Sequence, residues 1–471
     1  MNFEVNKVRE NIPVFDQSEG PDQHNPKKTV FLNLVKRHKL LSAFCSLILF
    51  FSLVFVFLGG LSNPSGAIKS LVFAAGKEIA VDDKNHTNIL LLGVGGGKHD
   101  GADLTDTIMI ASLDHDNRVL SFLSIPRDLY FKTELSGKNK INAVYDSVKA
   151  STGSSDYALT YLKDEIAKSF GVDIHYYAKV DFAGFTQIID ALGGINVEVE
   201  NDIYDPYYPK DGTIEYETFY IKKGSQQLDG ETALKYVRSR KTTSDFDRSL
   251  RQQQVITAIK GKALSLGTLT NPKKIRDLYD SISDNYETNI SLREIIYLAK
   301  LADKYSDIKV KMHVMHDDPS RAGGFLYTPM RELYNGMFVL LPMGDNFDVI
   351  KQYAEIVLYY PGLFEDGVSL QILNGTKTPG QAATVRMHLK RLGFSVPRFG
   401  NADTQDKTKT VIYLRNPQVA EETLNYLSAY LGAEIGSETP TIYNEEAYLS
   451  SADLILVIGE DFDNARINES E

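Results

Sequence analysis

Cysteine is almost absent from this chain of 471 residues, and acidic residues outnumber basic ones. The one cysteine, Cys45, lies in an apolar segment, so the rest of the chain can form neither a disulfide nor a cysteine-based zinc site. The formal net charge is −11. A protein that binds nucleic acid over a large area normally has a basic balance, so no nucleic-acid partner is expected.

Internal repeats and low-complexity tracts are also missing. Hydrophobic residues make up 43% of the chain and charged residues 24%, the usual proportions of a folded protein. A length of 471 residues is too great for one ordinary core, so the chain is expected to form two or three domains.

One long uncharged segment lies near the N-terminus. Residues 40–60, LLSAFCSLILFFSLVFVFLGG, are long enough to cross a bilayer at ~1.5 Å per residue. Basic residues precede this segment, and the first base after it is Lys69, which predicts a cytoplasmic N-terminus and an extracellular bulk. The polar stretch before it is longer than the usual start of a signal peptide. An uncleaved anchor is therefore favoured over a cleaved signal or a buried core helix.

The chain then alternates between strand and helix patterns. Short apolar runs predict strands at 88–94, 107–113 and 118–125. Helical spacing marks 155–170 and 182–194, with strand patterns at 176–182 and 195–200. This alternation indicates an α/β layered domain.

A change in composition after about residue 362 indicates a second, smaller α/β domain. Its pattern is βαβαβ, with strands at 368–373, 410–414 and 454–458 and helices at 381–392 and 418–431. The expected division is a cytoplasmic tail (1–39), a transmembrane helix (40–60), a connector (61–85), the first domain (86–362), the second domain (366–462) and a tail (463–471).

The first candidate site lies in a predicted hairpin. If Asp116-Asn117 is its tip, residues whose numbers sum to about 233 face each other, so Asp106 lies opposite Arg127. Both residues are then at the open ends of their strands, where ligands bind in layered α/β folds. A cross-strand ion pair without a ligand explains the same pattern equally well.

Two further groups of charges follow. In an extended Tyr236–Arg240 segment, Arg238 and Arg240 point the same way and could bind a dianion, although a solvated basic strand is the simpler interpretation. Asp245 can cap a helix that runs to about 264. One stripe of that helix begins with polar residues and continues with apolar ones, namely Asp245, Arg248, Gln252, Ile256, Ile259 and Ala263. Because the apolar half must face the core, the polar half faces inward too, which predicts either a ligand cavity lined by charge or internal salt bridges. Arg251 lies away from this stripe.

Other familiar catalytic patterns are weak or missing. The glycine-rich loop from Gly93 to Gly101 lacks the spacing of a Walker loop. His99 and His175 are each isolated, which favours structural roles, and no Ser-His-Asp arrangement can be defended.

Together these stretches resemble the LytR-CpsA-Psr family of cell-wall glycopolymer transferases over roughly residues 86–345. The matching segments, in order, are NILLLG from Asn88, TDT from Thr105, SIPRDLY from Ser124, KINAVY from Lys140, DFAGFTQIIDALGGINVEV from Asp181, LDGETALKYVRSRK from Leu228 and DFDRSLRQQQVI from Asp245. VSLQILNGT from Val368 and ADLILVIG from Ala452 look like the C-terminal domain that often follows in this family.

The resemblance implies an α/β/α sandwich around a mixed sheet, with a polyprenyl chain in an apolar groove to which Phe182, Phe185 and Ile189 could contribute; a plain core face explains these three residues equally well. It implies Mg²⁺, or another divalent ion such as Mn²⁺, with Asp106 as a ligand. It places the substrate pyrophosphate on Arg127, Arg238, Arg240, Arg248 and Gln252, and the catalytic role on Arg127, Arg238 and Asp245. The acceptor would be a hydroxyl of peptidoglycan.

One departure from the family pattern concerns the metal. Many members carry a second acid in the sequence LGxD, whereas this chain has Leu92-Gly93-Val94-Gly95. Asp100 or Asp103 is the expected substitute.

The function expected from the resemblance is transfer of a glycopolymer from a polyprenyl-pyrophosphate carrier to peptidoglycan, at the outer face of a bacterial cell membrane. A phosphohydrolase that uses water as acceptor and a non-catalytic binder or scaffold for lipid-linked glycans are the alternatives, and the missing acid favours the binder. Transcriptional regulation is disfavoured because the chain is acidic and has no helix-turn-helix pattern.

Overall fold

The computed structural model describes residues 79–97, 101–209, 215–239, 283–291, 308–364 and 367–467, together with isolated positions between 251 and 305. Several predictions fall outside these residues, namely the anchor at 40–60, Asp100, Arg240, Asp245, Arg248 and Gln252. Within the described parts of the chain, no helix is both long and apolar enough to span a bilayer.

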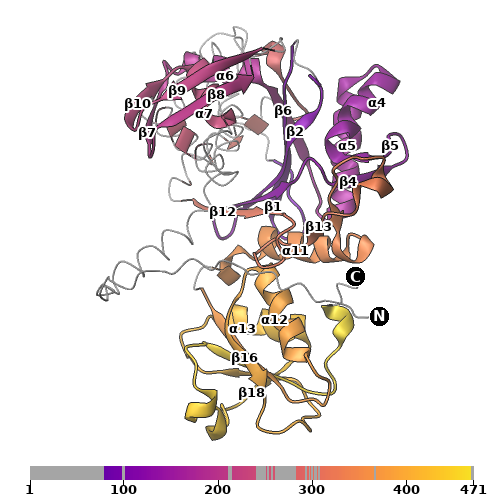
Figure 1. Cartoon of the computed structure of the whole chain (residues 1–471), viewed down its shortest axis with the longest axis vertical. Helices are drawn as coiled ribbons and strands as arrows, with labels where there is room; N and C mark the ends of the chain where they lie inside the picture. Colours follow the sequence, from indigo (N-terminus) through magenta and orange to yellow (C-terminus); the bar gives the residue numbers. More distant parts are fainter. Residues whose placement is uncertain are drawn as a thin grey trace, which may run out of the picture. The chain divides into compact units, whose positions relative to one another are not determined.

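A six-stranded mixed sheet forms the centre of the first part of the chain (Figure 1). Its order is β11-β6-β1-β2-β3-β12. β1 is antiparallel to β2 and parallel to β6, whereas β3 is antiparallel to β2 and parallel to β12. The strands are β1 (His86–Val94), β2 (Thr105–Asp114), β3 (Val119–Ile125), β6 (Tyr176–Asp181), β11 (Tyr286–Thr288) and β12 (Lys309–Val314).

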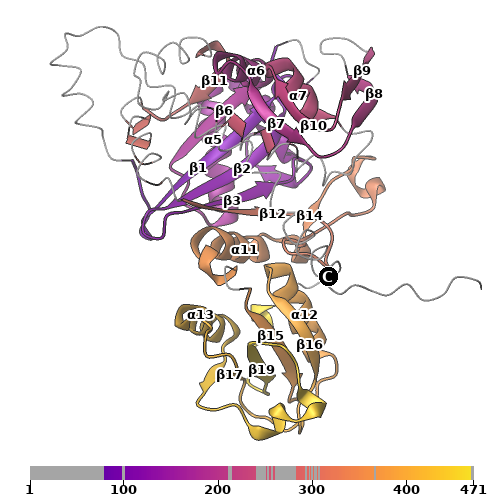
Figure 2. The same cartoon turned by 90° about the vertical axis from the view of Figure 1, so that its left-hand side faces the viewer.

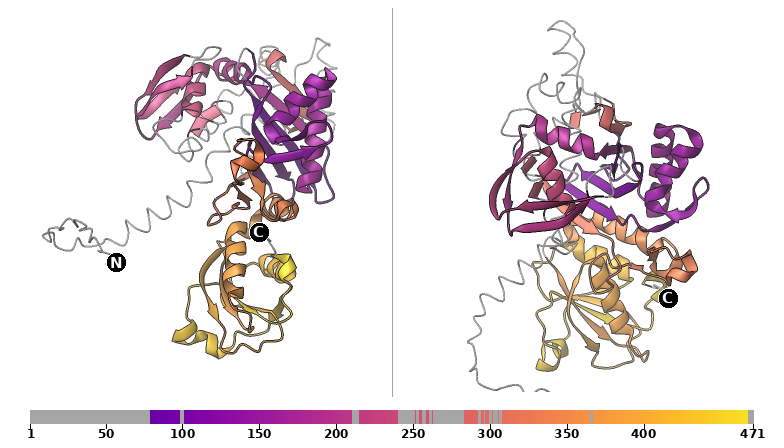
Figure 3. Two further views of the ribbon diagram at one scale, coloured as in Figure 1. Left: turned by 45° about the vertical axis from the view of Figure 1, so that its right-hand side comes forward. Right: turned by 45° about the horizontal axis from the view of Figure 1, so that its top comes forward.

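Helices cover both faces of this sheet. Alternate side chains such as Leu90 and Ile110 pack with α4 (Val144–Thr152), α5 (Ser155–Phe170) and α11 (Asp348–Tyr359). The residues between them, such as Leu91 and Met109, pack with α6 (Phe182–Ala191) and α7 (Gly230–Arg238). Figures 1 and 3 show α4 and α5 on one side of the sheet and the magenta α6–β10 region on the other. The expected α/β/α layering is therefore present.

Local sequence signals explain the elements that were predicted well. Ser154 caps α5 by accepting a hydrogen bond from the Tyr157 amide, and Gly171 ends the helix with φ 66°. The β2–β3 turn is fixed by Asp114, whose Oδ1 accepts hydrogen bonds from the amides of Asp116 and Asn117. Asp114 pairs with Val119, so the observed register has the predicted sum.

Two short antiparallel sheets of two strands each lie beside α6 and α7, outside the central sheet (Figure 2). β7 (Ile195–Val199) pairs with β10 (Gly224–Leu228), and β8 (Ile203–Pro209) pairs with β9 (Tyr216–Ile221). The strand predicted at 195–200 is therefore confirmed, but its partner comes from a later part of the chain.

The extended conformation predicted for Tyr236–Arg240 is wrong for Tyr236, Val237 and Arg238, because α7 continues to Arg238. Asp229 caps this helix by accepting a hydrogen bond from the Thr232 amide, and Ala233, Tyr236 and Val237 form its buried face. The capping residue and the helical spacing are both visible in the sequence.

The C-terminal part of the chain contains a five-stranded sheet of order β16-β15-β19-β17-β18. The predicted strands and helices of this region are present, and β16 and β18 are additional. The elements are β15 (Ser369–Asn374), α12 (Gln381–Leu392), β16 (Ser395–Asn401), β17 (Val411–Leu414), α13 (Glu421–Leu431), β18 (Glu434–Gly436) and β19 (Leu454–Ile458).

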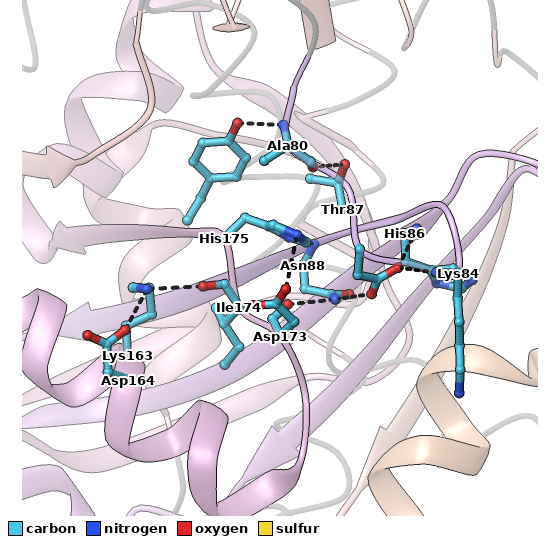
Figure 4. Close-up of polar contacts among 12 residues, drawn as sticks. Ala80, Lys84, His86, Thr87, Asn88, Lys163, Asp164, Asp173, Ile174 and His175 are labelled. Atoms are coloured by element: carbon cyan, nitrogen blue, oxygen red, sulfur yellow. Dashed lines mark hydrogen bonds and ion pairs between the residues drawn. The ribbon is translucent and has the colours of Figure 1, made fainter.

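A buried polar network fixes the amino-terminal ends of β1 and β6 (Figure 4). The fully buried Asn88 donates through Nδ2 to Asp82 Oδ2 at 2.9 Å and to the Asp173 carbonyl at 2.8 Å. Its backbone amide donates to His175 Nδ1 at 3.0 Å. The polar side chains at this end of the sheet therefore serve the fold.

Candidate active site

The candidate residues gather at the opposite end of the central sheet. β1 and β6 end side by side, with Val94 opposite Asp181, and β2 begins there because Thr105 also pairs with Val94. β3 runs parallel to β1 and ends at Ile125, two residues before Arg127. One edge therefore collects the ends of three strands and the start of a fourth, which is where ligands bind in open α/β sheets.

Asp106 is placed by a β-bulge. Gly93 pairs with Thr107 and Val94 with Thr105, so Asp106 has no partner on β1. An extra residue of this kind bends the strand and redirects its side chain. The Asp106 Oδ1 atom accepts a hydrogen bond from Arg127 Nη1 at 2.9 Å, as the hairpin register predicted.

The Arg127–Asp106 ion pair remains accessible, since the side chains are 38% and 47% exposed. Partial burial opposes the charge on Arg127, but the Asp106 charge and its hydrogen bond outweigh it and raise the pKa of Arg127. Arg127 therefore stays cationic at any physiological pH. Asp106 and Arg127 therefore do form the cross-strand ion pair. Because both side chains are partly exposed, a ligand can still reach them.

A second cation lies close to Arg127. Asp128 Oδ1 accepts a hydrogen bond from Lys140 Nζ at 2.6 Å, and Asp128 Oδ2 is 3.6 Å from Arg127 Nε. The short antiparallel pair of β4 (Tyr130–Thr133) and β5 (Gly137–Lys140) delivers this lysine by placing it opposite Tyr130. Sequence reasoning missed Lys140, although it begins the KINAVY motif.

Arg238 reaches the same edge from the other layer. Its guanidinium carbon lies 4.3 Å from the centroid of the Phe182 ring, and Phe182 directly follows β6. Its Nη1 donates to the Tyr208 hydroxyl at 3.0 Å. Two aromatic side chains thus hold Arg238 at the end of α7, and a cation over a ring face is attracted by the ring's electrons. Phe185 and Ile189 are buried, which confirms a core face for these two residues.

Arg251 supports the end of α7. It is 4% exposed, and its Nε donates to the Tyr236 carbonyl at 2.7 Å. Its Nη2 also donates to the Ser239 carbonyl. A cation is favoured at this position because the last carbonyls of a helix carry partial negative charge. The i, i+4, i+8 spacing with the buried Val255 and Ile259 could have revealed this role.

Of the two residues expected to replace the second acid, the structure describes Asp103 and not Asp100. Asp103 forms a close ion pair with Lys149, whose Nζ lies 2.7 Å from Oδ2. Asp103 would have to exchange that partner before binding a metal, and Asp100 lies outside the described residues. Among the described residues, no cluster of three or more histidine, cysteine or acidic side chains is arranged to hold a metal ion.

The glycine-rich loop approaches a carboxylate. A Cβ atom on Gly96, where φ is +70°, would lie 2.6 Å from Asp181 Oδ2, so glycine is required there. Burial raises the pKa of Asp181, against the hydrogen bond from the Gly184 amide and the charge of Lys179. A negatively charged group at this place disfavours phosphate binding by Gly96.

A pocket of about 250 Å³ opens beside the loop. Its lining combines cations and carboxylates, among them Lys149, Lys179, Asp103, Asp181 and Glu287. Lys179 is buried and forms an ion pair with Glu287. Internal ion pairs thus balance much of the charge in this pocket.

The comparisons with known proteins agree with the motifs. The model of the LytR_cpsA_psr family matches residues 62–337. A second model, described as LytR cell envelope-related transcriptional attenuator, matches residues 367–462.

Two curated relatives illustrate the similarity. The polyisoprenyl-teichoic acid–peptidoglycan teichoic acid transferase TagV of Bacillus subtilis is 30% identical over 263 residues, which are 54% of this chain and 60% of that protein. The cell wall biosynthesis protein LcpA of Corynebacterium glutamicum is 27% identical over 334 residues, covering 64% of this chain and 60% of that protein. The chain thus spans about 60% of the length of these relatives.

Among solved structures, the crystal structure of B. subtilis TagV is 26% identical and covers 59% of this chain and 98% of that one, with a TM-score of 0.41. Because that score is below 0.5, the family assignment depends on sequence similarity.

Proposed function

This chain belongs to the LytR_cpsA_psr family, and we propose that it transfers a glycopolymer from a polyprenyl-pyrophosphate carrier to peptidoglycan. The family match over residues 62–337 is the observation that carries the proposal. Within that range, Arg127 and Asp106 form an accessible ion pair at the ligand-binding edge of the sheet. TagV is named as a teichoic acid transferase and LcpA as a cell wall biosynthesis protein, which supports the same activity here.

In the proposed reaction, Arg127 and Arg238 hold the pyrophosphate from two sides of one edge. Arg240, Arg248 and Gln252 are the further proposed contacts. A sugar hydroxyl of peptidoglycan attacks the phosphorus that carries the glycan, its new P–O bond forms, and the phosphoanhydride bond breaks to release polyprenyl phosphate. Asp245 is the proposed acceptor of the hydroxyl proton. The fixed guanidinium groups offset the negative charge that grows on the phosphate oxygens.

Mg²⁺ or Mn²⁺ is the proposed cofactor, with Asp106 as its carboxylate ligand. Asp106 pairs with Arg127 through Oδ1 and remains 47% exposed, which fits this role, because Mg²⁺ is commonly held by one or two carboxylates together with substrate phosphates. When bound, the ion would neutralise phosphate charge and orient the phosphoanhydride. Asp100 and Asp103 remain the proposed second ligands, and Asp103 would first have to leave Lys149.

The proposed location is the bacterial cell membrane. Residues 40–60 would form a single-pass anchor with a cytoplasmic tail at 1–39 and the remaining chain outside, where peptidoglycan is found. A connector at 61–85, a catalytic domain at 86–362, a C-terminal domain at 366–462 and a short tail complete the proposed division.

A non-catalytic binder of lipid-linked glycans is the second candidate function. It is favoured by one specific feature, the ion pair that engages Asp103 in a chain that lacks the LGxD acid. Such a binder would keep the arginine contacts and perform no transfer.

The test uses the purified full-length chain in detergent with a polyprenyl-pyrophosphate glycan, peptidoglycan and Mg²⁺. Arg127→Ala and Arg238→Ala are each expected to lower the transfer rate by roughly 10²–10³-fold, the usual effect of removing one group that stabilises developing charge. Arg321→Ala is the matched control, since Arg321 forms an equally short, exposed ion pair with Asp318 at 2.9 Å.

The two candidates give different results. Binding of the lipid without turnover in any divalent metal ion would establish the binder and refute the transferase. Release of free glycan phosphate without transfer to peptidoglycan would identify a hydrolase.

A further inference from the structure

Four tyrosines are exposed on the hairpin formed by β8 and β9. Tyr204, Tyr207, Tyr216 and Tyr220 are each between 54% and 64% exposed. The aliphatic side chains Ile203 and Ile221 and the ring of Phe219 in the same hairpin are buried. The outward surface is therefore built from rings that carry a hydroxyl group.

The four rings share one side of the hairpin, here called the tyrosine face. Tyr204 is the cross-strand partner of Tyr220, and Tyr216 lies on the same side of β9 as Tyr220 by strand alternation. The Tyr207 ring packs edge-on against Tyr216, with centroids 6.0 Å apart. Neighbouring rings on a paired sheet give a broad, preformed surface.

The inner side of the hairpin is attached to the candidate active site. Tyr208 accepts the hydrogen bond from Arg238 Nη1 at 3.0 Å. The buried Ser239 donates through Oγ to the buried Asp205 at 2.8 Å. The hairpin that carries the tyrosine face therefore packs directly against the end of α7, where the proposed pyrophosphate-binding arginine lies.

The charges around the tyrosine face disfavour an anionic ligand. On the described hairpin and its flanks, the four carboxylates of Asp202, Asp205, Glu215 and Glu217 accompany two lysines, Lys222 and Lys223, and Lys235 of the neighbouring α7 is paired with Glu231. Glu217 and Lys235 form an ion pair at 2.9 Å, and Tyr220 donates its hydroxyl hydrogen to Asp202 at 3.3 Å. An anionic lipid surface is bound by a cluster of cations in excess, which this surface does not present.

We propose that the tyrosine face binds the glycan strand of the peptidoglycan acceptor, an inference that rests on the proposed transferase function. A pyranose ring has an apolar C–H face that can stack on an aromatic ring and hydroxyl groups that can hydrogen-bond a tyrosine hydroxyl. The donor already has a pyrophosphate for the arginines to hold. The acceptor strand offers them no comparable charge, so it needs a surface of this other chemistry close to Arg238.

The direct test uses a tryptophan reporter in the full chain, which has no tryptophan of its own. Tyr216→Trp places the sole indole on the tyrosine face, and Tyr157→Trp is the matched control on α5, where Tyr157 is 50% exposed. Chitotetraose, an uncharged oligomer of N-acetylglucosamine, is the probe. We expect a saturable change in the Tyr216→Trp fluorescence and none in the control. No change in Tyr216→Trp at millimolar probe would overturn the proposal.

A kinetic test separates this proposal from the proposed function. Combining Tyr204→Ala with Tyr216→Ala is expected to raise the KM for peptidoglycan strands at least tenfold, while kcat and the KM for the lipid-linked donor stay unchanged. The corresponding phenylalanine variants should retain most of the acceptor affinity. An equal loss for donor and acceptor would refute a specific acceptor surface.

Other results of the fluorescence experiment would show that the tyrosine face binds something other than a glycan. A Tyr216→Trp response to vesicles containing anionic lipid, without a response to chitotetraose, would identify a membrane-facing surface instead. A response that depends only on protein concentration would identify contact with a second copy. If chitotetraose binds but wild type performs no transfer, the transferase proposal fails while the glycan surface stands.

Discussion

The two ends of the central sheet use polar side chains in opposite ways. At the amino-terminal ends of β1 and β6, Asn88 is fully buried and its amide reaches Asp82, Asp173 and the Tyr359 hydroxyl. At the other end, Arg127 and Asp106 form an ion pair that is more than one third exposed on both sides. Asn88 is thus buried in the fold, whereas the Arg127–Asp106 pair stays accessible.

This difference separates stability from ligand binding. A buried polar group whose partner is removed leaves the partner unsatisfied, at a cost of about 1–3 kcal/mol. An exposed ion pair contributes only about 0–1 kcal/mol because water and salt screen it. The end that contains Asn88 should therefore govern unfolding, and the end that contains Arg127 should govern activity.

The largest expected effect on stability follows replacement of Asn88. Asn88→Leu removes the Nδ2 donor that contacts three acceptors, so Asp82, the Asp173 carbonyl and the Tyr359 hydroxyl each lose a donor. The free energy of unfolding should fall by about 3 kcal/mol, measured by denaturant titration. Activity per folded molecule should remain near that of wild type.

Arg127→Ala tests the other end of the sheet in the same comparison. Its free energy of unfolding should change by less than about 1 kcal/mol, while its transfer rate falls. If Arg127→Ala destabilised the chain as much as Asn88→Leu, the accessible ion pair would be a structural element and the contrast between the two ends would be lost.

Part of the pH dependence of stability should originate at the Asn88 end. His86 is buried on β1, with Nδ1 2.9 Å from Ser112 Oγ. Burial lowers the pKa of His86 below its ordinary 6.5, despite the nearby Asp114 charge. The unfolded chain then binds more protons, so stability is complete above pH 6.5 and decreases as pH falls below it. One such group contributes a slope of at most about 1.4 kcal/mol per pH unit.

His86→Gln should reduce that slope between pH 6.5 and 5, as measured by denaturant titration at each pH. Between pH 7.5 and 8.5 wild type and variant should show equal slopes, because His86 is neutral in both the folded and unfolded states. An unchanged slope in the acidic range would show that other groups cause the acid sensitivity.

The smallest expected effect concerns the helix that carries Arg238. Asp229→Ala removes the hydrogen bond from the Thr232 amide to Asp229 Oδ1 at 2.8 Å and should cost about 1 kcal/mol of unfolding free energy. Asp229→Ser is the control, since a serine oxygen can accept the same bond. A thermal-denaturation comparison should find the serine variant close to wild type. Equal losses in both variants would assign the role of Asp229 to its charge.

Several parts of the fold could be predicted because their causes are local. The cap at Ser154 and the left-handed Gly171 lie within a turn of the ends of α5, and the Asp114 turn sets the register that brings Asp106 to Arg127. The motifs also predicted the family, which the match over residues 62–337 confirms. The error at Arg238 arose from assuming an extended strand where Asp229 begins a helix.

Other features depend on contacts between distant parts of the chain. Lys149 neutralises Asp103 across a separation of 46 residues, and Arg238 is held by Phe182 from another helix. The bulge that redirects Asp106 appears only when β1 and β2 pair. Such contacts leave little periodicity or turn signal in a single sequence, because their partners meet only after the layers pack.

The sequence by itself therefore determined the apolar anchor prediction, the alternating elements and the hairpin register, since spacing and turn chemistry act between neighbouring residues. Only the tertiary structure decided which charges were buried, which were paired and which remained open to a ligand. Asn88 and Arg127 are both polar residues close to strand ends. What separates them is burial: Asn88 is enclosed by the fold, whereas Arg127 remains accessible to water, which screens its charge.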